Sequence, residues 1–251
     1  MNPLNPLAPV TDYQSMLNRI FWFTSASALV VIWMLRPHTP ALDDLLRQID
    51  VQVELGIDKT LPVPGGFLLP ALAIGMMTRI FRLHAVLSDW LGIRETFDIS
   101  VIMQEFAAAL DLDVSGLTYD MLQENRNPMM RTMFYSFVSG SRPSIDEKLI
   151  LQALEAWSWF WVGVEVTLVF AVGGLALVAS GATTLGLEVL AGSIVFAAFV
   201  LPAMRRQCVR YAIAQVRAIV DDPTRAETVR QVFSELTGEP TEEQSAARWA
   251  A

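Results

Sequence analysis

The chain has 251 residues, of which 53% are hydrophobic and 18% are charged, and its formal net charge is -8 at pH 7. An average soluble domain has roughly 25% charged residues, so this apolar excess is too large for a surface that faces only water. The acidic balance excludes nucleic acid as an expected partner, because phosphate binding needs clustered Lys and Arg. Cys208 is the single cysteine, so no intrachain disulfide can form, and we expect it to pack as a small hydrophobic side chain.

Four apolar stretches predict transmembrane helices. They cover residues 20–35, 60–78, 156–182 and 189–204, and their only charged residue is Glu165. At about 1.5 Å per residue, each stretch can approach the roughly 30 Å thickness of the hydrocarbon core of a bilayer. The first is too long for the core of a signal peptide and no small-residue cleavage site follows it, so we expect a retained anchor. The sequence therefore predicts an all-α, polytopic membrane protein with about four transmembrane helices, and the lipid bilayer is its first partner.

The charged residues between these stretches predict the orientation of the chain in the membrane. Arginine residues follow the second and fourth stretches, whereas segment 36–60 holds more acidic than basic residues. By the positive-inside rule, segment 36–60 and the turn 180–187 lie outside the cell, and both termini lie in the cytoplasm of a bacterium. The opposite orientation would place the arginine-rich flanks outside. We therefore expect a multi-pass protein of the bacterial inner (plasma) membrane.

The same pattern divides the chain into four parts. Residues 1–78 are the N-terminal tail and the first transmembrane pair with its outer loop 36–60, and residues 79–155 are a helical cytoplasmic domain. Residues 156–204 are the second transmembrane pair, and residues 205–251 are a cytoplasmic stalk helix followed by an acidic tail. Prolines and glycines crowd the outer half of the second stretch, between Pro62 and Pro70. They indicate either a broken helix that lines a cavity or, as we expect, a loop before a regular helix that starts near Pro70 and continues through Arg82.

The 79–155 region contains several residues that are typical of helix ends. We expect Gly92 to close a helix through Leu91, Asp98 to cap 99–110, Asn127 and Pro128 to open 129–138, and Ser144 with Glu147 to form a capping box. The spacing of Ile99, Ile102, Phe106 and Leu110 predicts a core face. From residue 144 to residue 180 nothing interrupts the next helix strongly, the fourth stretch continues past Arg205, and Asp222-Pro223 opens a last helix.

Small residues and tryptophans mark the surfaces of the predicted spans. A small-xxx-small ridge lets helices approach closely, and tryptophan prefers the depth of the lipid headgroups. The candidate helix-packing residues are Gly163, Thr167, Ala171, Ser193 and Ala197. The candidate interface anchors are Trp22, Trp33, Trp157, Trp159 and Trp161.

No motif for catalysis or for a cofactor is present. Two histidines and one cysteine cannot build a zinc site, and no phosphate-binding loop or serine nucleophile motif occurs. Residues 111–116 begin like a calcium loop, but Leu122 stands where a bidentate Glu is needed. We expect a polar, solvated face for His84 and Asp89. The sequence thus predicts no catalytic, cofactor-binding or metal-binding residue.

Glu165 is the candidate functional residue inside a span. An ionised carboxylate in hydrocarbon costs at least a few kcal/mol unless it is paired, neutralised or hydrated. A hydroxyl of the first span, from Thr24, Ser25 or Ser27, is the expected partner, and no full charge partner stands within any span. Two interpretations stay open, a structural anchor near the headgroups and a functional carboxylate inside the bundle.

Three segments resemble parts of a known class of proteins. RTMFY at 131–135, PSID at 143–146 and WSWFW at 157–161 with Glu165 are similar to segments of small bacterial membrane effectors of anti-phage systems, including retron-associated ones. The resemblance implies a membrane part that oligomerises or perturbs the inner membrane when a cytoplasmic partner signals infection. It carries over no site residue.

Three classes of function follow. The first is a membrane effector or regulatory subunit that assembles as a homo-oligomer and binds a cytoplasmic protein through 79–155 or 205–251. The second is a transporter or channel subunit, which would need polar groups along a path, and only Glu165 and the proline-rich stretch offer any. The third is a membrane enzyme without a recognisable motif, whose acids would be Asp89, Asp98, Asp111 and Asp113.

Overall fold

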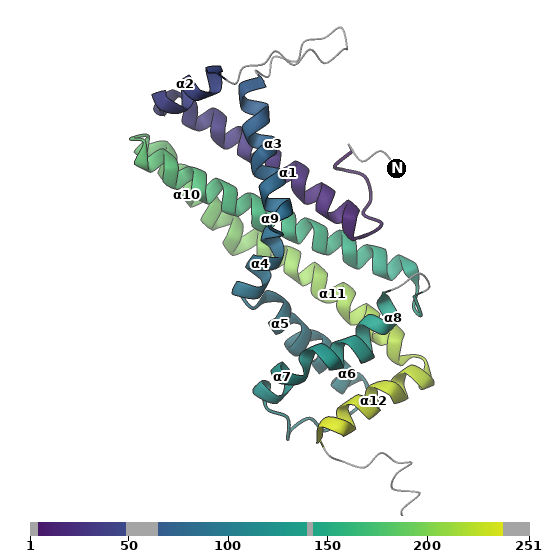
Figure 1. Ribbon diagram of the computed structural model, residues 1–251. Coiled ribbons are helices and arrows are strands. Elements are labelled where there is room, and N and C mark those ends of the chain that lie inside the picture. Colours follow the sequence, from purple (N-terminus) through teal and green to yellow (C-terminus); the bar gives the residue numbers. More distant parts are fainter. Residues whose placement is uncertain (1–4, 49–64, 140–142, 238–251) are drawn as a thin grey trace, which may run out of the picture. The chain divides into compact units, whose positions relative to one another are not determined.

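The computed structural model describes residues 5–48, 65–139 and 143–237 (Figure 1). All regular elements of these residues are helices, which confirms the all-α prediction. The chain divides into two compact units. The first unit consists of Met1–Val86 and Leu154–Arg206, and the second unit consists of Leu87–Ala153 and Gln207–Ala251.

The first unit contains the long apolar helices. Its elements are α1 (Tyr13–Leu35), the short 3-10 turn η1 (Arg36–His38), α2 (Pro40–Gln48), α3 (Gly65–Ile80), the first turn of α4 (Leu83–Trp90), most of α9 (Glu147–Ala179), α10 (Thr183–Val195), the π-helical turn η4 (Phe196–Val200) and the beginning of α11 (Leu201–Val220). As predicted, α9 is unbroken and the helix of the fourth stretch continues past Arg205.

Three helices of the described residues are long and apolar enough to cross a membrane. They cover Tyr13–His38, Glu147–Ala179 and Thr183–Val220. A fourth span exists only if α3 and α4 are counted together, and this pair is bent by 53°. The described residues thus contain three helices that could cross a membrane, and four spans remain a prediction that depends on the bent pair.

The bend lies at Phe81 and Arg82, and the expectation that a regular helix continues through Arg82 was wrong. The helix begins at Gly65, so the expected start near Pro70 was also wrong, and it contains Pro70 and ends at Ile80. Arg82 has a φ of 48°, a left-handed conformation that non-glycine residues seldom adopt. The Arg82 amide donates to the Arg79 carbonyl, and the Ala85 amide then donates to the Arg82 carbonyl, which starts α4 in a new direction. Pro62 and Pro64 lie outside the described residues.

Close contacts between helices hold the first unit together. α1 packs against α3 (Figure 1), and a Cβ on Gly75 would lie 2.0 Å from the Ser25 hydroxyl and 3.0 Å from the Phe21 carbonyl oxygen. Only glycine allows this approach. α9 and α10 form a hairpin in which a Cβ on Gly186 would lie 2.7 Å from the Gly174 carbonyl oxygen. A buried apolar cluster joins α1, α2 and α3 through Ala28, Ile32, Leu46, Phe67 and Ala71.

The second unit has a core of its own. Its elements are the rest of α4, α5 (Ile93–Phe97), the π-helical turns η2 (Asp98–Met103) and η3 (Arg131–Tyr135), α6 (Gln104–Ala109), α7 (Tyr119–Met130), α8 (Ser136–Val138), the ends of α9 and α11, and α12 (Pro223–Thr237). The fully buried side chains are Ile99, Met103, Phe106, Met130, Met133, Cys208, Val216, Ile219 and Val229. Ile99, Ile102 and Phe106 are buried as predicted, and Leu110 is half-buried.

Some of the expected helix ends in this unit were correct and others were wrong. Gly92, with a φ of 60°, separates α4 from α5, and Asp222 accepts from the Thr224 and Arg225 amides at the start of α12, both as predicted. Asp98 is no cap, because the helix of α5 runs through it into η2. Pro128 lies inside α7 instead of opening a helix. α9 starts at Glu147, but the side chain that caps it is Asp146, which accepts from the Lys148 amide.

Candidate functional site

Glu165 lies in the interior of the first unit, on α9. It is 1% exposed. Its Oε2 accepts a hydrogen bond of 3.0 Å from the Thr24 hydroxyl of α1, which is one of the three partners that the sequence suggested. Ser27 instead donates to the Phe23 carbonyl. Oε1 has no hydrogen-bond partner among the described residues, so the carboxyl group is buried with only part of its hydrogen-bonding capacity used.

His84 faces this carboxyl group, and the expectation of a solvated face was wrong for it. The ring is 5% exposed, whereas Asp89 on the same helix is exposed. The Nδ1 atom of His84 lies 3.8 Å from Glu165 Oε1. The change of direction at Arg82 is the physical reason, since the residues of α4 do not continue the helical phase of α3 and His84 is the residue of its first turn that is buried.

A tyrosine extends this cluster towards the surface. The Tyr13 hydroxyl lies 2.9 Å from His84 Nε2, and Tyr13, the first residue of α1, is 44% exposed. The other edge of the imidazole meets the indole of Trp161 at 6.0 Å between ring centroids. The Thr78 hydroxyl of α3, which donates to the Gly75 carbonyl, and the backbone N–H of His84 also lie near the Glu165 carboxyl group. Side chains from α1, α3, α4 and α9 thus converge on one buried acid, and we call this set the Glu165 cluster.

A second buried polar group in the first unit is fully satisfied. Arg19 is 2% exposed and forms a 2.6 Å ion pair with Glu155 Oε1. It also donates to the carbonyls of Pro6 and Ala8, and its guanidinium lies 4.6 Å from the centroid of the Trp159 ring. Because each charge has a counter-charge and several hydrogen bonds, this pair fastens the N-terminal segment to α9. The incomplete pairing of Glu165 distinguishes the Glu165 cluster as the candidate site.

The comparison with protein families covers nearly all of these residues. The model of the YmfE protein family matches residues 12–235. This chain belongs to the YmfE protein family. The description of the family names no activity, substrate or partner. No curated protein and no solved structure matches the chain.

In this YmfE family member, the second unit holds a buried acid of its own. Asp98 is 4% exposed and lies 3.4 Å from Arg126 and 3.9 Å from Arg94. Burial raises the pKa of Asp98 to about 6, because the loss of hydration outweighs the attraction of the two guanidinium groups, one of which donates to the carboxylate. Arg94 also donates to the Tyr135 hydroxyl, and burial raises the pKa of this phenol.

The other acids considered for an enzyme do not form a site. Asp89, Asp111 and Asp113 are exposed, and Asp113 caps the local turn by accepting from the Ser115 amide. Within the described residues, no group of three or more His, Cys, Asp or Glu side chains is arranged to hold a metal ion.

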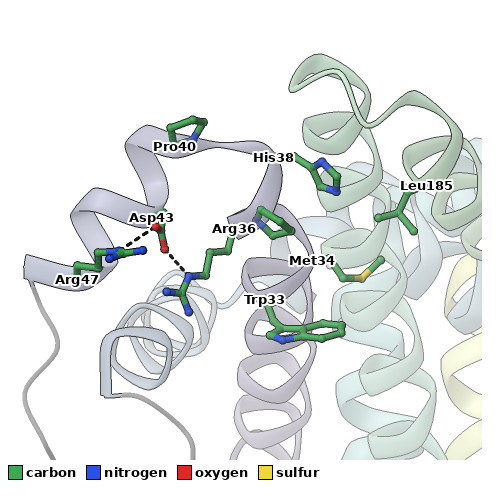
Figure 2. Close-up of a pocket in the computed structure, with 9 residues that line it drawn as sticks. Trp33, Met34, Arg36, His38, Pro40, Asp43, Arg47 and Leu185 are labelled. Atoms are coloured by element: carbon green, nitrogen blue, oxygen red, sulfur yellow. Dashed lines mark hydrogen bonds and ion pairs between the residues drawn. The ribbon is translucent and has the colours of Figure 1, made fainter.

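A surface pocket of about 770 Å³ lies at the end of α1 (Figure 2). Trp33 and Met34 of α1 line it together with His38 and, from α10, Leu185. Its charged groups are paired with each other, since Asp43 accepts from both Arg36 and Arg47. Besides these paired charges, the pocket is lined by the single imidazole of His38, so it brings together no cluster of reactive groups.

The predicted packing residues and tryptophans of this family member lie in different surroundings. A Cβ on Gly163 would lie 2.8 Å from the Leu201 side chain and 3.1 Å from the Met204 sulfur, so this part of the ridge packs against α11. Thr167 donates to the Gly163 carbonyl, Ser193 is buried and donates to the Val189 carbonyl, and Ala171 and Ala197 are half-buried. Trp33 is 66% exposed, Trp22, Trp157 and Trp159 are half-buried, and Trp161 is buried.

Sequence reasoning found Glu165 and Thr24 but missed His84 and Tyr13. The burial of His84 depends on the bend at Arg82, and no glycine or proline stands at that bend. The ion pair of Arg19 and Glu155 could have been predicted. Arg19 directly precedes the first apolar stretch and Glu155 directly precedes the third, so both are expected at the same face of the membrane. Opposite charges at one depth are typical of an ion pair.

Proposed function

We propose that this YmfE family member is an integral, multi-pass protein of the bacterial inner membrane that acts as an effector or regulatory subunit. The observation that carries the proposal is the exposed apolar surface of the long helices. Phe199 is 73% exposed, Ile194 66% and Leu175 60%. Contiguous apolar surface of this kind is unfavourable in water, whereas lipid covers it readily.

The spans and their orientation follow from the same features. We count the three continuous helices and the bent pair of α3 and α4 as four spans. Arg205, Arg206 and Arg210 follow the apolar part of the last span, and the positive-inside rule then places both termini in the cytoplasm. In this orientation the second unit is cytoplasmic and α2 is external.

Assembly into a homo-oligomer is supported by the surface of α10. A Cβ on Gly192 would meet no atom of the described residues within 4 Å, and Ala191 beside it is exposed. Small residues on a lipid-facing helix allow a second helix to approach closely. The Gly163 ridge is already occupied by Leu201 and Met204 within the chain, so we assign the contact between copies to the Gly192 face of α10.

Control by a cytoplasmic partner is supported by the second unit, which has its own buried core. α9 and α11 each contribute residues to both units, so the helices that enter this core are continuous with two of the spans. The resemblance of segments 131–135, 143–146 and 157–161 to membrane effectors of anti-phage systems supports phage infection as the trigger. In this proposal a partner that binds the second unit changes the assembly of the spans.

The membrane potential tests the proposal. Overproduction raises the assembled fraction by mass action, so it should depolarise or arrest cells even without the trigger. The comparison uses wild type, Gly192→Leu and an unrelated four-span protein at equal expression. We expect depolarisation with wild type, a weaker effect with Gly192→Leu, and none with the control. Equal potentials for wild type and the control, with the phage trigger also supplied, would refute the effector role.

A transporter or channel subunit is the second candidate, and the Glu165 cluster specifically favours it. Transporters place ionisable groups and helix breaks in the membrane interior, where the backbone groups freed by the break bind the solute. This function predicts flux of a particular solute at low expression without general depolarisation. Loss of that flux in Glu165→Gln, with an unchanged resting potential, would favour this candidate over the effector.

A further inference from the structure

We infer that Glu165 and His84 form one proton-binding site inside the first unit, and that the Tyr13 hydroxyl connects this site to the surface. The inference does not depend on an effector role, because it concerns the charge state of the folded protein alone. It rests on the geometry of the Glu165 cluster and on the unpaired oxygen of its buried acid.

The charges of the site require a shared proton. An ionised carboxylate that is 1% exposed would cost several kcal/mol without a counter-charge. The imidazole 3.8 Å away is the group that can supply one. With one proton on either residue the pair is neutral overall, a second proton makes it cationic, and loss of the proton leaves it anionic. Because the two groups interact closely, they titrate as a pair.

Among the described residues, no other charge on the packed elements replaces this partner. α1 contributes Tyr13 and Thr24, α3 contributes Thr78, and α4 contributes His84, while α11 meets α9 near Gly163 through Leu201 and Met204. Arg82 at the bend acts on His84 by its positive charge. Arg79 is bound to Asn18 and Gln14, and Arg19 is bound to Glu155.

The bend gives the carboxylate form additional stabilisation. The amides of Ala85 and Val86 both donate to the Arg82 carbonyl, whereas the His84 backbone N–H faces the Glu165 carboxyl group. The N-terminal end of a helix carries a partial positive charge. Glu165 therefore has donors for its ionised form in Thr24 and the start of α4, and an acceptor for its neutral form in the imidazole.

The route of the proton follows from the two imidazole nitrogens. Nε2 lies within hydrogen-bond distance of the partly exposed Tyr13 hydroxyl, and Nδ1 faces Glu165 Oε1. A proton taken up at Nε2 can be balanced by release of the Nδ1 proton to Glu165, which changes no oxidation state. The 3.8 Å gap exceeds a hydrogen bond, so this transfer needs a small approach of the ring or a bridging water.

Trp161 provides the readout for a test. Its indole ring contacts the edge of the His84 ring, and a protonated imidazole beside an indole changes the fluorescence of that indole. The full-length protein in phospholipid nanodiscs would be titrated between about pH 5 and pH 9 while tryptophan fluorescence is recorded. We expect a titration step that is lost in both His84→Gln and Trp161→Phe, with unchanged helix content and particle size.

The carboxylate is tested by Glu165→Gln, which keeps the shape of the side chain and removes its charge. Without the counter-charge the step should move to lower pH by about one unit, which is about tenfold in proton affinity. The matched control is Glu188→Gln, an exposed acid on α10, which should leave the midpoint unchanged. Carboxyl infrared difference spectra of wild type and Glu165→Gln give a second readout that does not require the histidine variant to fold.

Three results would overturn the inference. They are the absence of a titration step in wild type, a step that persists unchanged in His84→Gln, and an unchanged midpoint and infrared spectrum in Glu165→Gln.

Discussion

Asp98 is predicted to destabilise the second unit at neutral pH, despite two arginines nearby. Its pKa in the folded protein is about 6, against 3.8 for an exposed aspartate. The difference is about two units, and each unit corresponds to about 1.4 kcal/mol. Above pH 6 the folded protein therefore carries an ionised, buried acid at a cost of about 3 kcal/mol relative to the unfolded chain.

The direction of the pH dependence follows from this shift. Because the folded state holds the proton more tightly than the unfolded state, stability is lowest above pH 6 and rises as the pH falls from 6 towards 3.8. Asp98→Asn removes the titration, so the variant should be more stable than wild type at pH 8 by about 1–3 kcal/mol. Near pH 4 the two proteins should have nearly equal stability.

Hydrogen exchange of the full-length protein, followed by mass spectrometry, measures this effect locally. Peptides from α6 and α7 report the opening of the second unit after correction for the intrinsic exchange rate. We expect greater protection at pH 5 than at pH 8 in wild type and no such difference in Asp98→Asn. Asp120→Asn changes an exposed acid of the same unit and should keep the wild-type difference. Greater protection of wild type at pH 8 would refute the reasoning, because the arginine pairs would then outweigh the cost of burial.

The remaining predictions concern helix packing and one ion pair of the first unit. Gly163→Leu should lower stability in detergent by about 1–3 kcal/mol, because the new side chain meets Leu201 and Met204 at once, and Ile194→Leu, at a side chain that is 66% exposed, should not; equal melting temperatures for both would disprove the contact. Gly75→Ala should cost a similar amount, since the Phe21 backbone must move, and an unchanged thermal midpoint would contradict the close approach of α1 and α3. Glu155→Gln leaves Arg19 buried without its counter-charge and should lower the free energy of unfolding by about 2–3 kcal/mol, less than for a fully buried pair because Glu155 is 38% exposed. If the double variant Glu155→Gln, Arg19→Met is no more stable than Glu155→Gln alone, the two side chains are not coupled.

Length and apolarity alone made the long helices of this fold predictable. The continuous α9 follows from a run without proline. The passage of the last helix beyond Arg205 follows from the helical spacing of Val209, Ile213, Val216 and Val220, and Pro202 lies at the start of α11, directly after the π-helical turn η4. A hydroxyl donor for Glu165 from the first apolar stretch was also within reach, because a carboxylate in an apolar helix must find a donor and that stretch holds Thr24, Ser25 and Ser27. In both cases the local sequence is sufficient to predict the feature.

The bend at Arg82 and the burial of Asp98 could not be predicted, because tertiary contacts determine them. A left-handed arginine has no local signature, and without it the sequence pattern places His84 on a polar face. Asp98 precedes an apolar helical pattern and so resembles a cap, yet the preceding residues 93–97 are also helical and carry the chain through it. Pro128 follows Asn127 in a pattern typical of a helix start, but it lies near the end of α7, directly before the π-helical turn η3, where one missing amide hydrogen bond is tolerated.

The orientation of the chain in the membrane tests the central claim most directly. Single cysteines at Asp50 and at Asn125, in a Cys208→Ala background, would be treated in intact cells with a thiol reagent that does not cross the inner membrane. Four spans with cytoplasmic termini predict labelling at position 50 and none at position 125 until the cells are opened. Labelling at position 125 without labelling at position 50 would invert the topology, and labelling of both before lysis would contradict a membrane-spanning bundle.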